Sequence, residues 1–500
     1  MTVSQKRSLA CLLGLALIHA PVSAGVTSVV MVAAEGDPVA VGNLGNLNAP
    51  FTNGDGRVGF TFSLVAGGTG VWYDDGVRWL SIDADPDVLT GGESTMGIGN
   101  GGEFIYSPSI NGGDGVWGEL GLVLVENTPA PGFPAGVVTT FHSRPQMIDD
   151  GTAYWVAGFN ETGGMSTEGR VLYRSRGAGP PEVVIRSDDL VDGLPVARTS
   201  GVSFDYDVSG DGAHRISILL LDDGTPNLEV VEVGGTTVAR EGQPTGAGDF
   251  WENFDDVSIN ASGDYLFSGD TDGVTDTDEF LAYDAVIALR EGDTVDGVVL
   301  DPGSTVQALS LNDLGQAVFT WRVGAVEHLF FAADASDLGA STVLLTVGDE
   351  VDSDGDGVAD ILVTDLTASG TVGPGLDLAE DGFLFVGIDF EPVGGGTERE
   401  AIVRFGLGVV PQPDQLYRSS VTDLSPGWQQ RVPLPLTPAS ALDPGWPRPF
   451  VVPGTLDDLG VVAEGAPLVL YRLLDASGGG LGADLRVIRG PSPDDLQVSY

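Results

Sequence analysis

Two stretches, Leu311-Asn-Asp-Leu-Gly-Gln-Ala-Val-Phe319 and Ile259-Asn-Ala-Ser-Gly-Asp-Tyr-Leu-Phe267, repeat a single pattern. In each, an apolar residue precedes an Asn-x-x-Gly turn, and a short apolar run typical of a strand follows. The asparagine can accept hydrogen bonds from its own turn, and the glycine can adopt the positive φ that closes a tight hairpin. The pattern therefore predicts the corner between two antiparallel strands.

Looser copies of this turn recur along the chain at intervals of 46 to 67 residues. The seven turn glycines are Gly56, Gly102, Gly151, Gly212, Gly263, Gly315 and Gly382. Four strands fit within one repeat: in the fifth copy near 256–259, 264–268, 280–283 and 286–290, and in the sixth near 307–311, 316–323, 327–332 and 342–347. Four antiparallel strands in about fifty residues form one propeller blade. The sequence therefore predicts an all-β fold with a seven-bladed β-propeller.

A second signature follows the fourth strand of a blade, as in Ala239-Arg-Glu-Gly-Gln-Pro244 and Leu289-Arg-Glu-Gly-Asp293. A similar stretch, Ala33-Ala-Glu-Gly-Asp-Pro38, comes before the first turn, whereas the last blade, around 375–406, has only three clear strands. Residues 27–34 are therefore predicted to supply the missing strand of that blade. Such pairing closes the ring and removes open sheet edges.

With these motifs, the chain resembles secreted bacterial tandem-repeat proteins of the choice-of-anchor type. Those proteins carry Asn-x-x-Gly-x-x-x-Phe repeats and Arg-Glu-Gly-Asp-x-Pro turns, and the resemblance covers residues 26–406. It is closest in the fifth and sixth copies. It implies a propeller-like fold in an extracellular or envelope-anchored protein. It implies no agreed activity or ligand, so no functional residue can be transferred.

The N-terminus has the order of a secretory signal peptide in residues 1–24. Lys6 and Arg7 precede an apolar run, and small residues up to Ala24 form a cleavage site. A retained membrane anchor is the alternative, although the apolar run is too short to span a bilayer. We therefore expect a secreted or cell-envelope protein, located outside the cytoplasm, with no membrane span after cleavage.

The remaining chain is predicted to form two parts. Residues 25–408 carry the repeats and should form the propeller, whereas residues 409–500 begin with a proline-rich linker. Apolar runs near the C-terminus favour a small β module, and a partly extended appendage is the alternative. The only cysteine, Cys11, lies within the predicted signal peptide, so stability must come from packing or from bound ions.

The charge balance excludes several partners. The chain has 72 acidic residues against 22 lysines and arginines, for a net charge of −50. Such a field repels nucleic acid and anionic membranes, attracts divalent cations and favours solubility as a monomer. We therefore expect no nucleic-acid partner, and a glycan or a protein as the extracellular ligand.

One acidic loop has the spacing of a calcium site. Asp352, Asp354, Asp356 and Asp360 occupy positions 1, 3, 5 and 9, with the carbonyl of Val358 at position 7, as in EF-hand, dockerin and thrombospondin type-3 loops. Position 12 is a valine where those loops have an acid. The loop lies in an insertion of about a dozen residues in the repeat. These residues predict a structural calcium ion, and a solvated acidic loop is the alternative.

Other chemistry is sparse. A second acidic group in one hairpin reads as a solvated turn; its members are Asp270, Asp272, Asp276 and Asp278. The histidines after the signal peptide are too scattered for a metal motif, and the sequence has no nucleophile elbow, zinc-protease motif or phosphate loop. The tryptophans of the repeats are expected to pack between blades.

Two hypotheses for function follow. The leading one is a non-catalytic binding or structural scaffold, stabilised by calcium, with its ligand in the propeller channel or the top loops. The alternative is a hydrolase or lyase that acts on extracellular polysaccharide from a site at the channel. An enzyme should present an acid, a base and an arginine from several blades with shifted pKa values, whereas a scaffold should present ordinary solvated acids.

Overall fold

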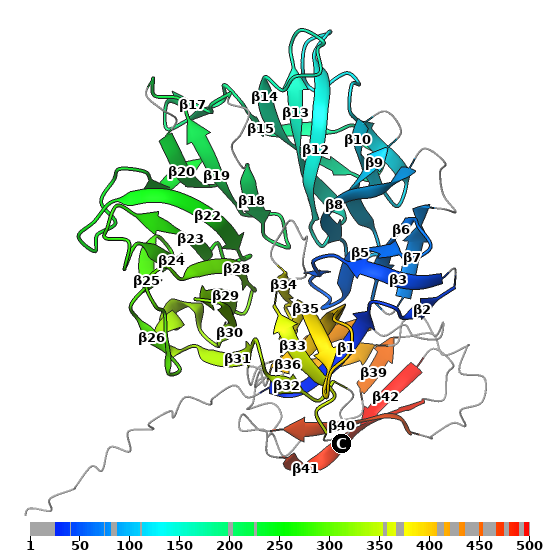
Figure 1. Cartoon of the computed structure of the whole chain (residues 1–500). Helices are drawn as coiled ribbons and strands as arrows, with labels where there is room; N and C mark the ends of the chain where they lie inside the picture. The colour runs from blue at the N-terminus through cyan, green and yellow to red at the C-terminus, as the bar shows by residue number, and fades with distance from the viewer. Residues whose placement is uncertain are drawn as a thin grey trace, which may run out of the picture.

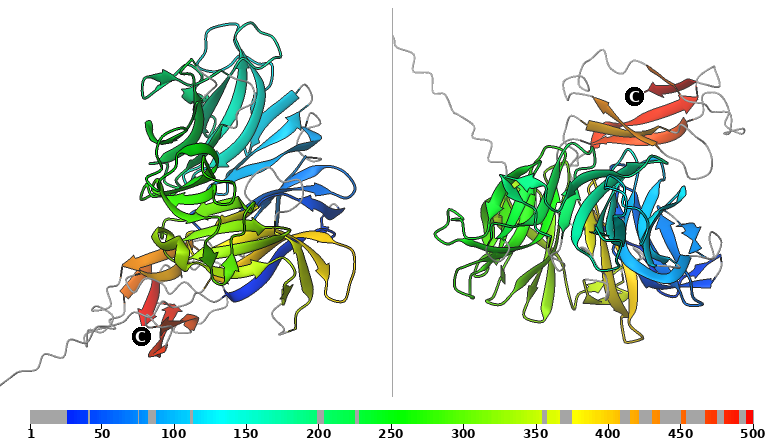
Figure 2. Two further views of the ribbon diagram at one scale, coloured as in Figure 1. Left: turned by 60° about the vertical axis from the view of Figure 1, so that its left-hand side comes forward. Right: turned by 90° about the horizontal axis from the view of Figure 1, so that it is seen from above.

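In the computed structural model, residues 26–407 form seven antiparallel sheets around a central axis (Figure 1). The structure describes these residues except 41, 75, 82–87, 111–112, 199–203, 225–227, 354–357 and 367–374, together with six strands after residue 414. The predicted signal peptide lies outside the described residues. Figure 2 shows the sheets standing face to face around the ring, so the predicted seven-bladed propeller is confirmed.

Each blade begins with a strand at the axis and ends with one at the rim. The strands of blades 1 to 3 are β3 (Gly42–Leu47), β5 (Val58–Leu64), β6 (Thr69–Tyr73) and β7 (Gly76–Leu80); β8 (Val88–Ile98), β9 (Phe104–Ile110), β10 (Gly113–Gly118) and β11 (Gly121–Val125); and β12 (Val138–Met147), β13 (Thr152–Asn160), β14 (Gly169–Arg176) and β15 (Glu182–Arg186). The strands of blades 4 to 6 are β18 (Asp205–Val208), β19 (Arg215–Leu221), β20 (Leu228–Val233) and β21 (Thr236–Arg240); β22 (Trp251–Ile259), β23 (Tyr265–Thr271), β24 (Glu279–Tyr283) and β25 (Val286–Arg290); and β28 (Thr305–Leu311), β29 (Ala317–Val323), β30 (Val326–Ala332) and β31 (Thr342–Thr346).

Blade 7 combines the two ends of the propeller sequence. Its strands are β33 (Ile361–Asp365) and β34 (Leu376–Leu378), both paired with β35 (Phe383–Pro392), then β36 (Arg399–Leu407) and β1 (Val26–Ala34). The antiparallel pairing of β1 with β36 runs from Val26 opposite Leu407 to Ala34 opposite Ala401. The N-terminal strand therefore closes the ring, as predicted from the signature at residues 33–38.

Short elements connect or extend the blades. They are β2 (Pro38–Val39), β4 (Phe51–Thr52), β16 (Leu190–Val191), β17 (Leu194–Pro195), β26 (Thr294–Val295), β27 (Val298–Val299), the 3-10 helix η1 (Ala335–Ala340) and β32 (Glu350–Val351). β4 extends the axial edge of blade 1, where it pairs with β5.

The repeat turns link neighbouring blades as well as neighbouring strands. All seven turn glycines have φ between 70° and 93°, the left-handed region that favours glycine. Asn312 Oδ1 accepts hydrogen bonds from the backbone N–H groups of Leu314 and Gln316, at 3.1 and 3.0 Å. The side-chain amide of Asn312 also donates to the carbonyl of Ala379 in blade 7, at 3.2 Å. Asn260 makes the same contact with Asn312, at 3.2 Å, so the asparagine joins the turns of successive blades.

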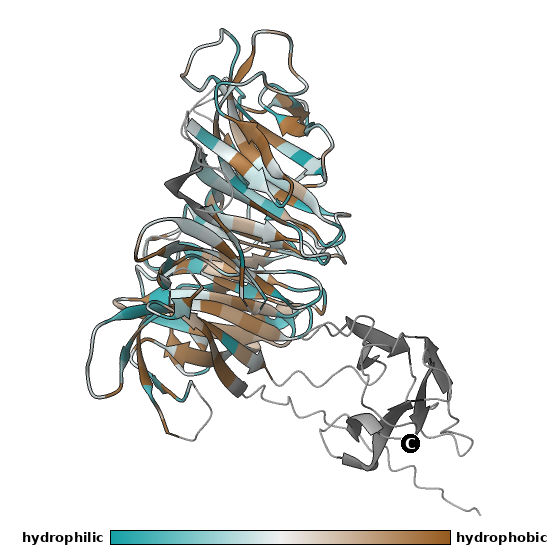
Figure 3. Ribbon diagram, turned by 90° about the vertical axis from the view of Figure 1, so that its right-hand side faces the viewer, coloured by the Kyte–Doolittle hydropathy of each residue, from teal (hydrophilic) through white to brown (hydrophobic). Residues whose placement is uncertain are grey.

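The core is divided among the interfaces between blades. Among the described residues there are seven hydrophobic clusters, and each contains residues of two neighbouring blades. Trp155 and Trp321 are fully buried in two of them, which confirms the predicted packing role for these residues. Figure 3 shows hydrophobic positions recurring along the strands of the blades, interspersed with hydrophilic ones. The propeller is thus stabilised by burial between sheets, without a single central core.

The C-terminal region contains the predicted β module in the form of two sheets. One pairs β37 (Gln415–Ser420) with β38 (Gln430–Pro435). The other has the order β39 (Phe450–Pro453), β42 (Asp495–Ser499), β41 (Gly480–Arg489) and β40 (Pro467–Leu474). No helix within the described part of the chain is long and apolar enough to cross a membrane.

Candidate functional site

The propeller channel contains an acidic cavity of about 340 Å³. Every blade contributes to its wall from the strand nearest the axis, or from β4 in blade 1. The charged residues of the wall are Arg144, Asp205, Asp207, Asp255, Asp256 and Asp377. A volume of this size is at the lower end of the range for small-molecule sites. The cavity therefore has the size of a ligand site and a wall with an excess of acidic residues.

A second chamber of about 110 Å³ continues the channel. The two chambers share Gln146, Asp207 and Asp377 in their walls, so they are adjoining sections of one passage. The repeat turns add the carboxyls of Asp149 and Glu380 to the smaller chamber, together with that of Asp313. None of the described residues in its wall is a lysine or an arginine.

Two bulges aim charged side chains into the larger cavity. The pairing of β12 with β13 shifts register between Ser143 and Gln146, and that of β22 with β23 shifts between Phe254 and Val257. Arg144 lies in the first bulge with φ of 51° and forms an ion pair with Asp205 of blade 4. Asp255 and Asp256 lie in the second bulge. Bulges commonly re-aim side chains in this way, and here they break the alternation by which strand faces are recognised in a sequence.

Asp207 ties three blades together beside the cavity. Its Oδ1 accepts from the side-chain amide of Gln146 in blade 3, at 2.5 Å, and its Oδ2 accepts from the backbone N–H of Ile259 in blade 5, at 2.8 Å. Burial, the largest effect, raises the pKa of Asp207 to about 6, although these hydrogen bonds favour the charged form.

Asp377 of blade 7 connects its two neighbouring blades in the same way. Its Oδ2 accepts from the backbone N–H and the hydroxyl of Thr52 in blade 1, at 2.7 and 3.1 Å. Its Oδ1 accepts from the hydroxyl of Ser310 in blade 6, at 3.0 Å. Burial raises the pKa of Asp377 as well. Both carboxyls therefore hold blades in register at the axis.

Asp256 differs from these two residues because it accepts a hydrogen bond from its own strand. Its Oδ1 accepts from the backbone N–H of Val257, at 2.9 Å. Burial, with the nearby charges of Asp207 and Asp255, raises the pKa of Asp256 to about 7, and the charge of Arg144 partly opposes the shift. Acids and an arginine from several blades thus meet in the channel with shifted pKa values. The ordinary solvated acids expected of a scaffold are not what the channel contains.

Glutamates recur near the start of the third strand in several blades; Glu279 and Glu400 are buried and Glu229 is half-buried. Glu229 accepts from the backbone N–H of Phe254 in blade 5, and Glu279 accepts from that of Val306 in blade 6, both at 2.7 Å. Glu400 of blade 7 accepts from the backbone N–H of Leu47 in blade 1, also at 2.7 Å. Each glutamate therefore joins its blade to the first strand of the next. Burial is the main cause that raises the pKa of all three carboxyls.

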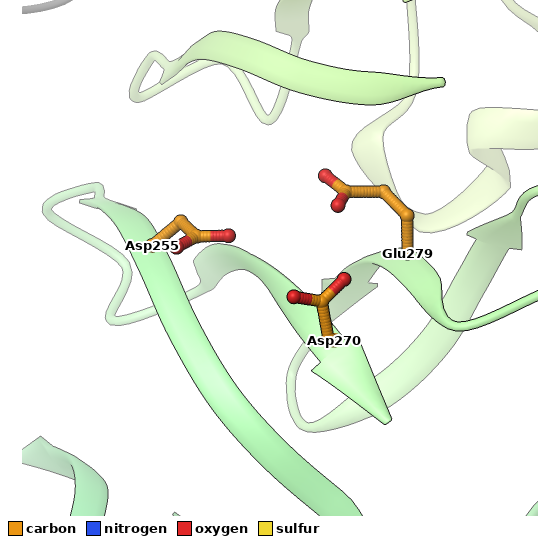
Figure 4. A group of neighbouring side chains, drawn as sticks. All are labelled: Asp255, Asp270 and Glu279. Carbon is orange, nitrogen blue, oxygen red and sulfur yellow. The ribbon is translucent and has the colours of Figure 1, made fainter. Parts of the chain in front are cut away.

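Three carboxylates gather at the edge of the larger cavity. Asp255 of β22, Asp270 of β23 and Glu279 of β24 offer oxygens that all lie within 4.8 Å of one another, and their side chains point toward a common space (Figure 4). Glu279 is 4% exposed, whereas Asp255 is exposed and also lines the cavity. Asp270, expected from the sequence to lie in a solvated turn, is half-buried within this group.

The predicted calcium loop is only partly described. Asp354 and Asp356 lie outside the described residues. Both carboxylate oxygens of Asp360 accept hydrogen bonds from Ser353, one from its backbone N–H and one from its hydroxyl, each at 2.7 Å. Asp352 is half-buried and Val358 is exposed. Calcium binding by this loop remains a prediction.

The sequence contains a signal for these glutamates that lies outside the repeat motifs themselves. Glu229 and Glu279 each stand twelve residues before the glutamate of the Arg-Glu-Gly signature. In both blades the backbone N–H of the later glutamate donates to the backbone carbonyl of the earlier one. The distance is 2.9 Å from Glu241 to Glu229 and 3.1 Å from Glu291 to Glu279. An acid at a constant distance from a repeat signature, just before an apolar strand, could have indicated this position. The bulged residues have no comparable signal.

The raised pKa values predict that the folded propeller is most stable in mild acid. Burial raises the pKa of Glu229 and of Asp389 to about 7 and that of Glu380 to about 8, and repulsion by neighbouring carboxylates adds to the shift of all three pKa values. Because these folded-state values exceed those of the unfolded chain, the resulting stabilisation is complete below about pH 4 and is lost as pH rises through 7 to 8. Asp249 has the opposite shift, since Arg290 lowers its pKa to about 2, and its contribution is lost in stronger acid.

We therefore expect the highest melting temperature near pH 5, with a decrease of about 5 °C by pH 9. The measurement is thermal unfolding followed by circular dichroism from pH 3 to 9, at constant ionic strength and with chelator. A melting temperature that stays constant or rises between pH 6 and 9 would contradict the assignment.

Comparison with known proteins extends only to overall shape. The chain matches no known protein-family model and no curated protein sequence. Similar solved structures include prolyl oligopeptidase B from Galerina marginata, at 12% identity over 75% of this chain and a TM-score of 0.39, and TolB from Acinetobacter baumannii, at 10% over 71% and a TM-score of 0.31. A glucose dehydrogenase is 12% identical over 75% of this chain, with a TM-score of 0.30. The chain spans about half of the oligopeptidase (53%), 78% of TolB and 98% of the glucose dehydrogenase.

Proposed function

We propose that the protein is a non-catalytic binding scaffold, secreted or held at the cell envelope, whose channel holds a small positively charged ligand. The observation that carries the proposal is the convergence of acidic side chains from several blades on one cavity of about 340 Å³. A wall with five aspartates and one arginine attracts ammonium and guanidinium groups and repels anions. The ligand is therefore a small organic cation, such as a polyamine or an amino sugar.

The shifted pKa values of the channel acids are those expected of an enzyme, but the hydrogen bonds of Asp207 and Asp377 support binding over catalysis. The carboxylate oxygens of Asp207 and Asp377 accept hydrogen bonds from neighbouring blades. An acid or base in a reaction must be able to transfer a proton to or from the substrate. Carboxyls held in this way are better suited to shape and charge the cavity. The predicted signal peptide and the resemblance to secreted repeat proteins support the location.

Titration of the chelated protein with spermidine and with glucosamine tests this function. By calorimetry, we expect binding of at least one cation that weakens about tenfold in Asp256→Asn, which removes a charge from the wall but keeps the shape. Glu252→Gln on the same strand is the matched control, because Glu252 is exposed and outside the cavity wall. N-acetylglucosamine, which lacks the charge, should not bind. Equal binding of neutral and charged sugars, or no binding of either cation, would refute the proposal.

The second candidate function is a polysaccharide hydrolase. It is favoured by the placement of Asp256 beside Arg144 and Asp207 in one cavity, where the pKa of Asp256 rises to about 7 and suits a general acid. This reading predicts that neutral polysaccharides are cleaved and that Asp256→Asn abolishes the cleavage. A reducing-end assay on a panel of neutral glycans distinguishes the two functions.

A further inference from the structure

The residue opposite this third-strand glutamate on the second strand differs between blades. Among the four glutamates that face a partner on the second strand, Glu229 is opposite Leu220, Glu279 opposite Asp270, Glu327 opposite Arg322 and Glu400 opposite Asp389. Arg322 forms an ion pair with Glu327, and Glu327 is 4% exposed in its side chain. Blade 6 thus places a positive charge beside its buried carboxylate, as such a group requires.

Blade 5 has a second carboxylate where blade 6 has the arginine. Asp270 faces Glu279 directly across the strand pair, and Asp255 of the bulge brings a third carboxylate to the same place (Figure 4). Like charges opposite each other in a sheet are destabilising, and most of all when buried. A cation in the space to which the three groups point would neutralise this repulsion.

A buried hydroxyl next to the three carboxylates also lacks a partner. Ser268 is 1% exposed, and its Oγ has no hydrogen-bond partner among the residues that the structure describes. It stands two residues before Asp270 on β23, so both side chains project from the same face of the strand, and it lines the same cavity as Asp255. A buried hydroxyl without a partner costs about 1–3 kcal/mol. A bound cation, or a water molecule in its coordination shell, would satisfy it.

We propose that Asp255, Asp270 and Glu279 bind a hard divalent cation, calcium or magnesium, with the Ser268 hydroxyl beside it. A site made only of oxygen donors selects such ions. Glu279 also accepts a hydrogen bond from the backbone N–H of Val306, which orients its carboxylate and connects the ion to blade 6. The exposed Asp255 opens the site to the channel, so the ion has a route in from solvent. The ion would do in blade 5 what Arg322 does in blade 6.

The first test counts ions on the chelated, full-length protein by calorimetry with calcium chloride and with magnesium chloride. We expect the wild type to bind one ion more than Asp270→Asn, and to gain several degrees in melting temperature that the variant does not gain. The control is Asp354→Asn with Asp356→Asn, which changes the acidic loop at 352–360 and should leave the blade 5 ion in place. The same stoichiometry in wild type and Asp270→Asn would overturn the proposal. Comparison of the two salts identifies the preferred ion.

A second variant keeps the test informative if Asp270→Asn folds poorly. Asp270→Arg copies the arrangement of blade 6, with a guanidinium opposite the buried glutamate. It should fold with a melting temperature near that of the ion-loaded wild type, and calcium or magnesium should no longer bind at this site. If Asp270→Arg were strongly destabilised, or if it kept the ion, the position would not be a cation site. Neither result depends on the organic ligand of the channel, so failure here and failure of the proposed function are distinguishable.

Discussion

Deletion of residues 26–34 is expected to lower the melting temperature of the propeller by more than about 10 °C, with blade 7 becoming the first site of proteolysis. These residues form β1, which supplies the outer strand of blade 7 and pairs with β36 along its length. Ala33 and Ala34 are at most 2% exposed and lie in different clusters, at the two interfaces of blade 7. The deletion therefore removes buried surface from both interfaces and leaves β36 as an open edge.

Two variants separate ring closure from a general effect of changing β1. Val30 is 38% exposed, so Val30→Ser changes the strand without touching the core and should shift the melting temperature by no more than about 1 °C. Val30→Cys with Arg404→Cys places two thiols opposite each other on β1 and β36. Under oxidising conditions they should cross-link the first and last strands of the propeller sequence. Unchanged protease resistance of residues 375–407 after the deletion would argue against closure by this strand.

The propeller could be predicted because its information is local and repeated. Each turn depends on a glycine with positive φ and on a polar residue next to it, and both are visible within five residues of sequence. Ring closure could also be predicted, because the Glu-Gly signature that follows the fourth strand of a blade also occurs once before the first complete blade. The predicted strands of blades 5 and 6 agree with the observed ones to within three residues, except that β22 begins at Trp251, five residues early.

That exception explains why the acidic wall of the channel was not predicted, although the channel itself was expected to hold the ligand. β22 is longer than expected because a bulge at Asp255 and Asp256 interrupts the alternation of apolar residues, and the same bulge brings both acids to the cavity. The remaining wall residues come from all seven blades, and each blade contributes few of them. Contacts such as that between Thr52 and Asp377 join positions more than 300 residues apart, and nothing in either local sequence indicates its partner. The local acidic loop at 352–360 was predicted from its spacing, whereas the three carboxylates of blade 5 are separated in sequence by strands.

The tie made by Asp377 gives the second large expected effect. Asp377→Ala leaves the Thr52 N–H, the Thr52 hydroxyl and the Ser310 hydroxyl without their acceptor, at the point where blades 6, 7 and 1 meet. Each buried donor left unpaired costs about 1–3 kcal/mol. Relief of the repulsion between Asp377 and Asp207 offsets part of this cost. We therefore expect a net loss of about 3 kcal/mol in the free energy of unfolding, measured as a lower urea midpoint.

Graded variants show whether the loss comes from the tie itself. Asp377→Asn keeps one acceptor oxygen and should lose about half as much as Asp377→Ala, while Ser310→Ala removes a single donor and should cost about 1 kcal/mol. Glu252→Ala on an exposed position of β22 controls for removal of a negative charge, which alone slightly stabilises so acidic a protein. If Asp377→Ala were as stable as Glu252→Ala, Asp377 would not hold the blades together. In that case the negative charge of Asp377 would lower the stability of the fold, as expected of a residue that is retained to bind a ligand.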